Sequence, residues 1–369
     1  MKKIHNLFVI SLVIALLVPA CGPVRTDQPD CKNVDVFCVG FVTDLEKIDD
    51  NASNQSAWAG IEQAKKDLGI EAYYIETTDS KDFEKNILTF GLAEYDLIIT
   101  MGSIQSLATR QAALTFPKTL FIGIDQLQEE TKPIPPNLIG LVFPEDQAGF
   151  LVGALAAQMT KSKKLGAVCA TDRIPSVWRY GEGFKAGVNY IDPNLEVTVI
   201  YHNDVNNGKS FSDPEWSKIT TKSLVGQGVD ILFAVGGQTG NSAVLTAANN
   251  KIYAIGSEHD FYYTLQDAQN KILSSAIKLI DSSVFELIKA AKEGDFSGGA
   301  NFTGKVNYAP YHDLIKKVPS DVKARMKDIS SGLLDGSITT NVKPSKPESS
   351  TDPSLEPTIE PTIEPTPES

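Results

Sequence analysis

The 369-residue sequence predicts an α/β fold made of two similar halves. Short, continuously apolar runs, typical of parallel strands covered on both faces, alternate with stretches in which apolar residues recur at helical spacing. This alternation is interrupted by the proline-rich segment 131–136 and then starts again. A hydrophobic content of 42% is enough to form two ordinary cores. The sequence therefore predicts two parallel sheets, each covered by helices.

In the first half, strands and helices follow one another without long gaps. After the strand 36–42, Trp58, Ile61, Ala64 and Leu68 fall at helical spacing, and this helix is expected to end near Gly69. The further predicted strands are 72–76, 96–100, 119–124 and 138–143, and the further predicted helices are 82–92 and 105–114.

The second half opens with a predicted helix at 147–159, in which Gly149 and Gly153 permit close packing. The strands expected after it are 164–169, 196–202, 231–235 and 252–255, and the helices between them are 177–191, 216–227 and 241–249. A long amphipathic helix is expected at 273–292, a short strand-like segment at 301–311 and a last helix at 319–330.

The N-terminal segment has the features of a signal peptide. Residues 1–20 have a basic start, an apolar stretch at 7–18 and a small residue before Cys21. The cysteine after the expected cut resembles a bacterial lipobox, which implies cleavage between Ala20 and Cys21 and lipid attached to Cys21. The protein would then be held at the extracytoplasmic face of the cell membrane. The alternative is a plain secreted protein with an incidental cysteine.

Both ends of the mature chain are expected to lie outside the folded part. Residues 21–35 are polar, lack periodicity and are interpreted as a tether. Residues 343–369 are rich in proline, glutamate and threonine and contain no aromatic residue, so they cannot form a core. We expect this tail to be disordered.

Composition excludes several classes of function. The net charge of −12 and the pI near 4.9 argue against a nucleic-acid-binding surface. The cysteines and histidines lack the spacing of a metal site, and neither a phosphate-binding loop ending in Gly-Lys-Ser/Thr nor a Gly-x-Ser-x-Gly elbow is present. We therefore expect no cofactor and no catalysis. Cys31 and Cys38 are close enough to pair after export, but Cys38 lies in the first strand, so we expect no disulfide.

The most informative polar segment follows the first predicted strand. Residues 49–58 are dense in amide and carboxylate groups and lie at the carboxyl end of that strand, where open α/β sheets bind small ligands. Such groups suit a ligand rich in hydroxyls. The alternative is that Asn51, Ser53 or Asn54 only caps the following helix.

Several stretches carry a resemblance to known proteins: the loop 50–58, the segments 142–153 and 175–187, the glycine turn 236–241, and residues 255–260 and 274–278. In these stretches the sequence resembles the basic membrane protein family of bacterial lipoproteins. Members of this family are substrate-binding proteins of ABC transporters, and characterised members bind purine or other nucleosides. The resemblance covers roughly 36–335 and implies a type I periplasmic-binding-protein fold with two Rossmann-like lobes and a ligand cleft between them. Lobe 1 would comprise 36–143 and about 275–300, and lobe 2 would comprise 144–274 and about 301–336.

The resemblance also implies a ligand site. Asp125, Glu258 and Lys278 would hold the ribose. The family usually has aspartate where this chain has Glu258, so either the longer Glu258 side chain reaches the ribose or Asp260 takes its place. Asp50 and Asn54 would contact the base edge or the sugar, Tyr180 would stack on the base, and Gly102 and Gly237 would let the backbone approach the ligand. Ser53 stands where the family usually has a stacking phenylalanine, which leaves purine selectivity open.

The same resemblance implies the partners. They would be an ABC permease and its ATPase, with the receptor acting as a monomer. The alternatives are a receptor for another small polar solute such as a sugar, a sensory or host-interaction lipoprotein without a transport role, and a nucleoside hydrolase.

Overall fold

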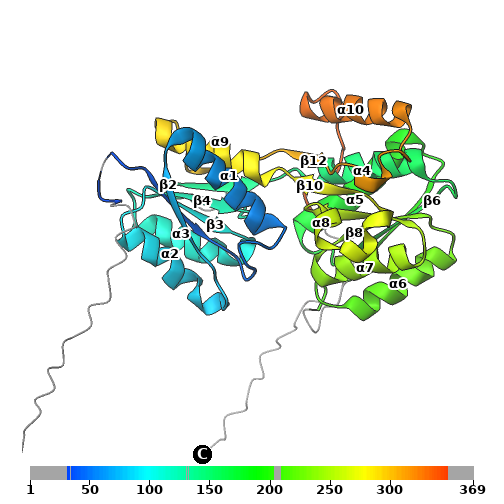
Figure 1. Cartoon of the computed structure of the whole chain (residues 1–369), viewed down its shortest axis with the longest axis horizontal. Helices are drawn as coiled ribbons and strands as arrows, with labels where there is room; N and C mark the ends of the chain where they lie inside the picture. The colour runs from blue at the N-terminus through cyan, green and yellow to red at the C-terminus, as the bar shows by residue number, and fades with distance from the viewer. Residues whose placement is uncertain (1–30, 34, 130, 132, 203–208, 348–369) are drawn as a thin grey trace, which may run out of the picture.

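The computed structural model describes residues 31–347, except 34, 130, 132 and 203–208. These residues form two lobes, each built on a six-stranded sheet, as Figure 1 shows. The predicted signal peptide, Cys21, the tether up to residue 30 and the tail beyond 347 lie outside the described residues. Among those that are described, no helix is long and apolar enough to cross a membrane.

Lobe 1 has strand order β11-β5-β4-β3-β1-β2, with all neighbours parallel. Helices α1 and α9 cover one face, and α2 and α3 cover the other. The strands are β1 (Cys38–Val42), β2 (Glu71–Ile75), β3 (Leu97–Met101), β4 (Leu120–Ile124), β5 (Leu138–Val142) and β11 (Ala300–Thr303). The helices are α1 (Ser53–Leu68), α2 (Phe83–Leu92), α3 (Ser106–Thr115) and α9 (Ile280–Glu293).

Lobe 2 repeats this arrangement with strand order β12-β10-β9-β8-β6-β7, in which only the β10–β12 pair is antiparallel. Helices α4, α5 and α10 cover one face, and α6, α7 and α8 the other. The strands are β6 (Lys164–Cys169), β7 (Glu196–Tyr201), β8 (Ile231–Val235), β9 (Tyr253–Glu258), β10 (Ile272–Lys278) and β12 (Val306–Tyr308). The helices are α4 (Glu145–Met159), α5 (Pro175–Ile191), α6 (Pro214–Gly226), α7 (Gly237–Asn249), α8 (Phe261–Thr264) and α10 (Ser320–Leu334).

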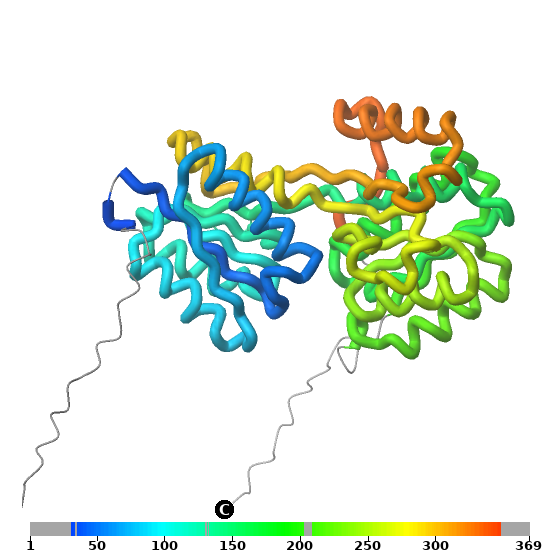
Figure 2. Tube along the Cα trace, viewed as in Figure 1, coloured from blue at the N-terminus to red at the C-terminus, as the bar shows by residue number. Residues whose placement is uncertain are grey.

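The described chain passes between the lobes after β5, after β10 and after β11, and Figure 2 shows the later two crossings in yellow and orange. Because β10 pairs with β9 and β11 pairs with β5, the lobe boundaries lie near residues 279 and 304. The sequence-based boundaries, near 275 and 301, were a few residues too early. The two predicted α/β lobes themselves are confirmed.

The predicted helix at 273–292 is wrong. Its first part is strand β10, and the helix α9 begins only at Ile280. The strand is buried along nearly its whole length, and its neighbours β9 and β12 supply backbone hydrogen bonds that a helix would replace. This correction matters for the site, because it places Lys278 at the end of a strand.

Glycines allow α4 and α5 to pack closely, as expected for Gly149 and Gly153. A Cβ on Gly153 would collide with the backbone carbonyl of Phe184, and one on Gly187 would collide with that of Phe150. The expectation that Cys31 and Cys38 do not pair is wrong, because they form a disulfide with a Cα–Cα distance of 5.7 Å. The segment before β1 folds back far enough to bring Cys31 within bonding distance.

Candidate functional site

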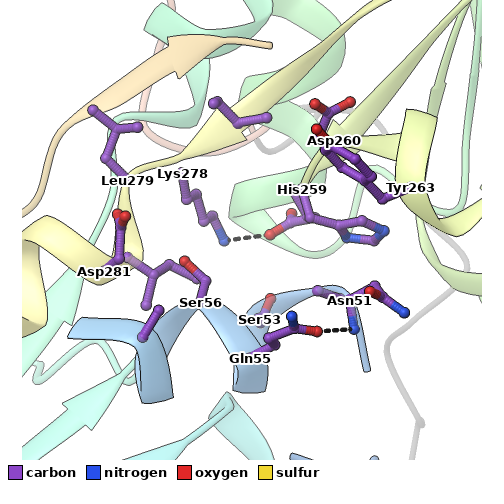
Figure 3. Close-up of a pocket in the computed structure, with 15 residues that line it drawn as sticks. Asn51, Ser53, Gln55, Ser56, His259, Asp260, Tyr263, Lys278, Leu279 and Asp281 are labelled. Atoms are coloured by element: carbon purple, nitrogen blue, oxygen red, sulfur yellow. Dashed lines mark hydrogen bonds and ion pairs between the residues drawn. The ribbon is translucent and has the colours of Figure 1, made fainter. Parts of the chain in front are cut away.

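The candidate site is a cavity of about 430 Å³ between the lobes. Lobe 1 contributes the start of α1 and the residues before it, and lobe 2 contributes the ends of β9 and β10 (Figure 3). This is the carboxyl-end edge at which doubly wound folds bind ligands. The polar side chains that line it include Asn51, Ser53, Gln55, Ser56, Glu258, His259, Asp260, Lys278 and Asp281.

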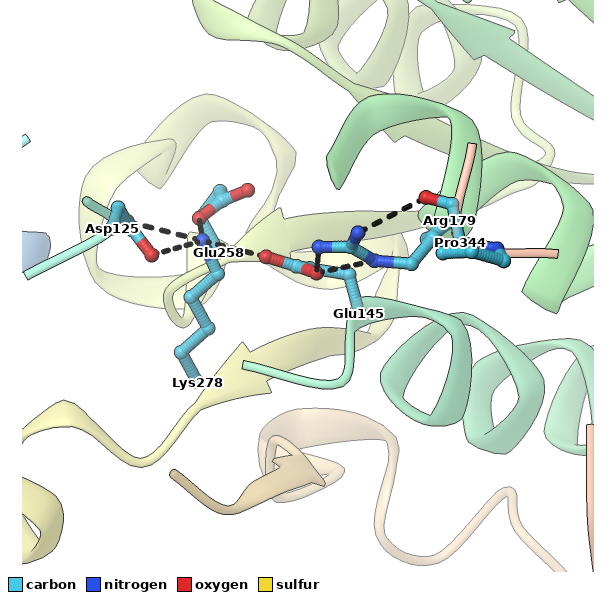
Figure 4. Close-up of polar contacts among 6 residues, drawn as sticks. All are labelled: Asp125, Glu145, Arg179, Glu258, Lys278 and Pro344. Atoms are coloured by element: carbon cyan, nitrogen blue, oxygen red, sulfur yellow. Dashed lines mark hydrogen bonds and ion pairs between the residues drawn. The ribbon is translucent and has the colours of Figure 1, made fainter. Parts of the chain in front are cut away.

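Lys278 is the centre of the charged groups at this site. Its Nζ lies 2.7 Å from Glu258 Oε2, 3.0 Å from Asp125 Oδ1 and 3.5 Å from Glu145 Oε1 (Figure 4). The Lys278 side chain is only 3% exposed, whereas Asp125 and Glu258 are 27% and 32% exposed. The lysine is therefore covered, while both of these carboxylates keep accessible surface for a ligand.

The backbone at both carboxylates is unusual. Asp125 follows β4 with φ of 58°, and Glu258 ends β9 with φ of 72°. Residues other than glycine rarely adopt positive φ, and such conformations concentrate at functional sites. The strain directs two carboxylates, one from each lobe, toward the same ammonium group.

Burial and charge set the protonation of this cluster. Burial alone would lower the pKa of Lys278, but Asp125, Glu258 and Glu145 together raise it well above its ordinary value. Burial raises the pKa of Asp125 and of Glu258, and the Lys278 charge opposes both shifts. The lysine is thus a fixed cation. Together, the ammonium and two partly exposed carboxylates can accept from and donate to neighbouring hydroxyls.

Glu145, which contacts Lys278, also forms an ion pair with Arg179. The sequence did not indicate this second ion pair. Arg179 Nε donates to Glu145 Oε2 at 2.9 Å, and the Arg179 Nη2 also contacts this oxygen. Glu145 is the first residue of α4 and is 3% exposed. It lies in the segment 142–153 that carried the family resemblance, but Arg179 is 34 positions away and nothing in the spacing predicted their contact.

Asp50 and Asn54 lie near the cleft but are engaged within their own loop. Asp50 accepts hydrogen bonds from the backbone N–H groups of Ala52, Asn54 and Gln55, so it caps α1. Asn54 is fully buried and donates to Asp44 Oδ1 at 2.7 Å. The N-cap residue of α1 is Ala52, and the side chain that accepts from the first N–H groups of the helix is that of Asp50 rather than the suggested Asn51, Ser53 or Asn54. Asp50 also lines a second cavity of about 440 Å³ that shares Asn51 and Tyr263 with the first.

The predicted stacking role of Tyr180 does not fit this structure. The ring is 0% exposed and packs in the core of lobe 2, where its centroid lies 6.2 Å from that of Phe233. An aromatic ring needs an open face to stack on a base, and Tyr180 has none. Its hydroxyl is buried and has no hydrogen-bond partner among the described residues. Tyr263 is the aromatic side chain that lines the cavity.

Gly102 and Gly237 do not line the main cavity, although both have positive φ, 90° and 53°. The Gly102 carbonyl accepts from Gln126 Nε2 at 3.1 Å, and a side chain on Gly237 would meet the carbonyl oxygen of Phe211 at 2.8 Å. Their backbone conformation therefore serves loop packing in this structure.

Asp260 and His259 lie on the lobe 2 side of the cavity. Asp260 accepts from the Tyr262 N–H at 3.1 Å and lies 2.7 Å from His312 Nε2. Burial lowers the pKa of His259 to about 4, so its ring is neutral near neutral pH. His259 Nε2 lies 3.2 Å from Thr264 Oγ1. Within the described residues, no group of histidine, cysteine and acidic side chains could hold a metal ion.

The sequence is similar to a protein-family model and to several curated proteins. The Bmp family model, described as ABC transporter substrate-binding protein PnrA-like, matches residues 37–309. The CD4+ T-cell-stimulating antigen of Listeria monocytogenes is 29% identical over 93% of this chain and 100% of its own length. The ABC transporter nucleoside-binding protein BmpA of Lactococcus lactis is 25% identical over 88% of this chain and 91% of its own.

A solved structure has the same fold. The ABC transporter solute-binding protein from Aeropyrum pernix superposes with a TM-score of 0.64 at 22% identity, over 82% of this chain and 92% of that one. The expected arrangement of two parallel-rich sheets as in periplasmic solute-binding proteins is therefore confirmed.

Proposed function

This chain belongs to the Bmp family of PnrA-like ABC transporter substrate-binding proteins, and from this premise we propose that it captures a nucleoside between its lobes. A protein of this family serves an ABC transporter by binding a small molecule.

The proposal rests mainly on one observation, the arrangement of Asp125 and Glu258 around Lys278. Asp125 and Glu258 approach Lys278 Nζ from different lobes and remain partly exposed. A vicinal diol presents two hydroxyl donors that suit such carboxylates, and the ammonium can donate to the same oxygens. A ribose at this position would contact both lobes, so its binding would favour lobe closure. The relative from Lactococcus named as nucleoside-binding supports this ligand class.

The second candidate is a sugar or another small polar solute. Ser53 lines the cavity where the family usually has phenylalanine, and the neighbouring Asn51, Gln55 and Ser56 are also polar. Without a stacking ring from lobe 1, a base would lose about 1–3 kcal/mol of stacking energy. The polar lining therefore weakens the case for a purine base. The carboxylates and the lysine that suit a ribose still make a nucleoside the first candidate.

A thermal-shift panel separates the two candidates. A ligand present at about 100 times its dissociation constant adds roughly 2.7 kcal/mol of stability. We expect stabilisation by at least one of adenosine, guanosine, inosine, cytidine and uridine, and none by free pentoses or hexoses. Stabilisation by sugars alone would favour the second candidate, and an unchanged midpoint with every nucleoside would contradict the proposal.

A matched pair of variants places the ligand in the cleft. Glu258→Gln removes one charged acceptor at a partly exposed position, and it should abolish most of the nucleoside-dependent shift. Glu286→Gln changes an exposed carboxylate on α9, and it should leave the shift intact. Equal shifts in both variants would place the ligand elsewhere. Recovery of intact nucleoside after long incubation would support binding without hydrolysis.

We further propose that the mature protein is a monomer anchored through lipid on Cys21 at the extracytoplasmic face of the membrane and delivers its ligand to a permease and ATPase. The support is the signal-like pattern of residues 1–20. Metabolic labelling with radioactive palmitate should label the native chain and leave Cys21→Ser unlabelled. Equal labelling of both would contradict the anchor.

A further inference from the structure

The last described segment of the chain, residues 339–347, lies against lobe 2, and we call it the C-terminal strap. Three polar contacts hold it. Thr340 Oγ1 donates to Asp146, Arg179 Nη1 donates to the Pro344 carbonyl at 3.1 Å, and Lys346 Nζ lies 2.6 Å from Asp172 Oδ2. These contacts join the strap to three separate elements of lobe 2.

All three contacts fall close to the ligand cleft. Asp146 is in the first turn of α4, next to Glu145, and Asp172 lies in the loop between β6 and α5. Arg179 is in the first half of α5. In a doubly wound sheet, such helix starts and post-strand loops are at the carboxyl-end edge where the ligand binds. The strap therefore crosses the ligand-proximal edge of lobe 2.

Arg179 connects the strap to the site, as Figure 4 shows. Its guanidinium group donates to Glu145 Oε2 through Nε and Nη2, and through Nη1 to the Pro344 carbonyl. The other oxygen of Glu145 lies 3.5 Å from Lys278 Nζ. The planar fork of donors fixes both partners at once, which a lysine could not do.

The charges around Glu145 connect Arg179 to the proposed ligand site. Glu145 is almost fully buried and is shared between two cations, Arg179 and Lys278. If Arg179 were absent, Lys278 would be the remaining cation within ion-pair distance of Glu145 among the described residues. The ammonium would then be drawn toward Glu145 and away from Asp125 and Glu258.

We propose that Arg179 is a positioning residue for the ligand site and that the C-terminal strap holds Arg179 in place. By neutralising Glu145, Arg179 leaves Lys278 directed at Asp125 and Glu258. The inference rests on the proposed function, because it assumes that these three residues receive the ligand. It assigns a part in ligand affinity to residues 339–347, which include the start of the tail that the sequence predicts to be disordered.

Calorimetric titration tests the proposal with whichever of the five nucleosides gives the largest thermal shift. Arg179→Gln should weaken binding by about tenfold or more, which is the range for an uncompensated buried charge. The strap variant Thr340→Val/Lys346→Ala should weaken it by about three- to tenfold, because Arg179 is retained but less constrained. Lys222→Ala, which removes an exposed cation from α6 on the other face of lobe 2, is the control and should bind like wild type.

A rescue experiment distinguishes a positioning role of Arg179 from a purely structural one. In Arg179→Gln/Glu145→Gln the unneutralised carboxylate is gone, so its affinity should return to within about threefold of Glu145→Gln alone. Additive losses in the double variant, or unchanged affinity in Arg179→Gln, would overturn the proposal.

A second readout works without any ligand. Urea denaturation of Arg179→Gln, of Lys278→Met and of the variant with both changes measures whether the two cations depend on each other. Because both contact Glu145, the loss of stability in the combined variant should differ from the sum of the two single losses. If wild type binds no nucleoside, the proposed function fails, and this comparison still decides the inference. Additive losses would overturn it.

Discussion

Lys278 Nζ lies 3.0 Å from Asp125 Oδ1 and 3.1 Å from Oδ2, so a side chain at the end of β10 in lobe 2 is bonded to the residue that follows β4 in lobe 1. The pair joins the two lobes next to the cleft. Lys278 is therefore held by both lobes at the place where the proposed ligand would contact them.

Replacing Lys278 with methionine should destabilise the protein by about 3–5 kcal/mol. The change leaves the carboxylates of Asp125, Glu145 and Glu258 close together without their shared cation. Urea denaturation measures the loss. Lys289→Met, which removes an exposed i,i+4 ion pair on α9, is the control and should change stability by no more than about 0.5 kcal/mol. Similar small effects in both variants would contradict the central role of Lys278.

Reduction of the Cys31–Cys38 disulfide should lower the free energy of unfolding by about 2–4 kcal/mol. The bond ties the segment before β1 to the first residue of that strand, which is buried. Chemical denaturation with and without reductant measures this effect. The variant Cys31→Ser should not respond to reductant, because Cys38 has then lost its partner and Cys169 is free and buried. Wild-type protein that is indifferent to reductant would argue against the bond.

A methyl group at Gly153 should cost about 1–3 kcal/mol, because it collides with the Phe184 carbonyl where α4 meets α5. Gly226→Ala is the matched control: it lies at the end of α6, where an added Cβ meets nothing within 4 Å. It should be neutral or stabilise the protein by up to about 1 kcal/mol. Thermal denaturation of the two variants distinguishes these outcomes, and equal midpoints would refute the close contact.

His259 should make the protein less stable in acid. Burial lowers its pKa from 6.5 to about 4, so below pH 6.5 the unfolded chain takes up a proton that the folded chain does not. Stability should therefore fall as the pH decreases from about 6.5 toward 4. Urea denaturation at several pH values should show a steeper decline for wild type than for His259→Gln. Parallel curves would show that the ring is not held neutral.

The order of strands and helices was largely predictable, because apolar runs such as Leu97–Met101 are buried on both faces of a parallel sheet. The region 273–292 was not. Strand β10 and helix α9 follow one another with only Leu279 between them, and the segment has no glycine or proline that marks the change. Only the pairing of β10 with β9 and β12 decides its conformation.

The site was predictable only in part, for a related reason. Asp125, Glu258 and Lys278 lie at strand ends, and the family resemblance pointed to them. Arg179 contacts Glu145 across 34 positions, through the packing of α5 on α4, and no local pattern encodes this contact. Tyr180 shows the opposite error: an aromatic residue in a matching segment proved to be part of the core.

The proposed ribose site is tested most directly by a calorimetric comparison of adenosine with 2′,3′-dideoxyadenosine, or of the equivalent pair for whichever nucleoside binds best. The two ligands differ only in the hydroxyls that Asp125, Glu258 and Lys278 are proposed to hold. We expect the dideoxy compound to bind at least about tenfold more weakly, since charged hydrogen bonds contribute roughly 1.5–3 kcal/mol each. Equal affinity for both compounds would contradict the proposed ribose site.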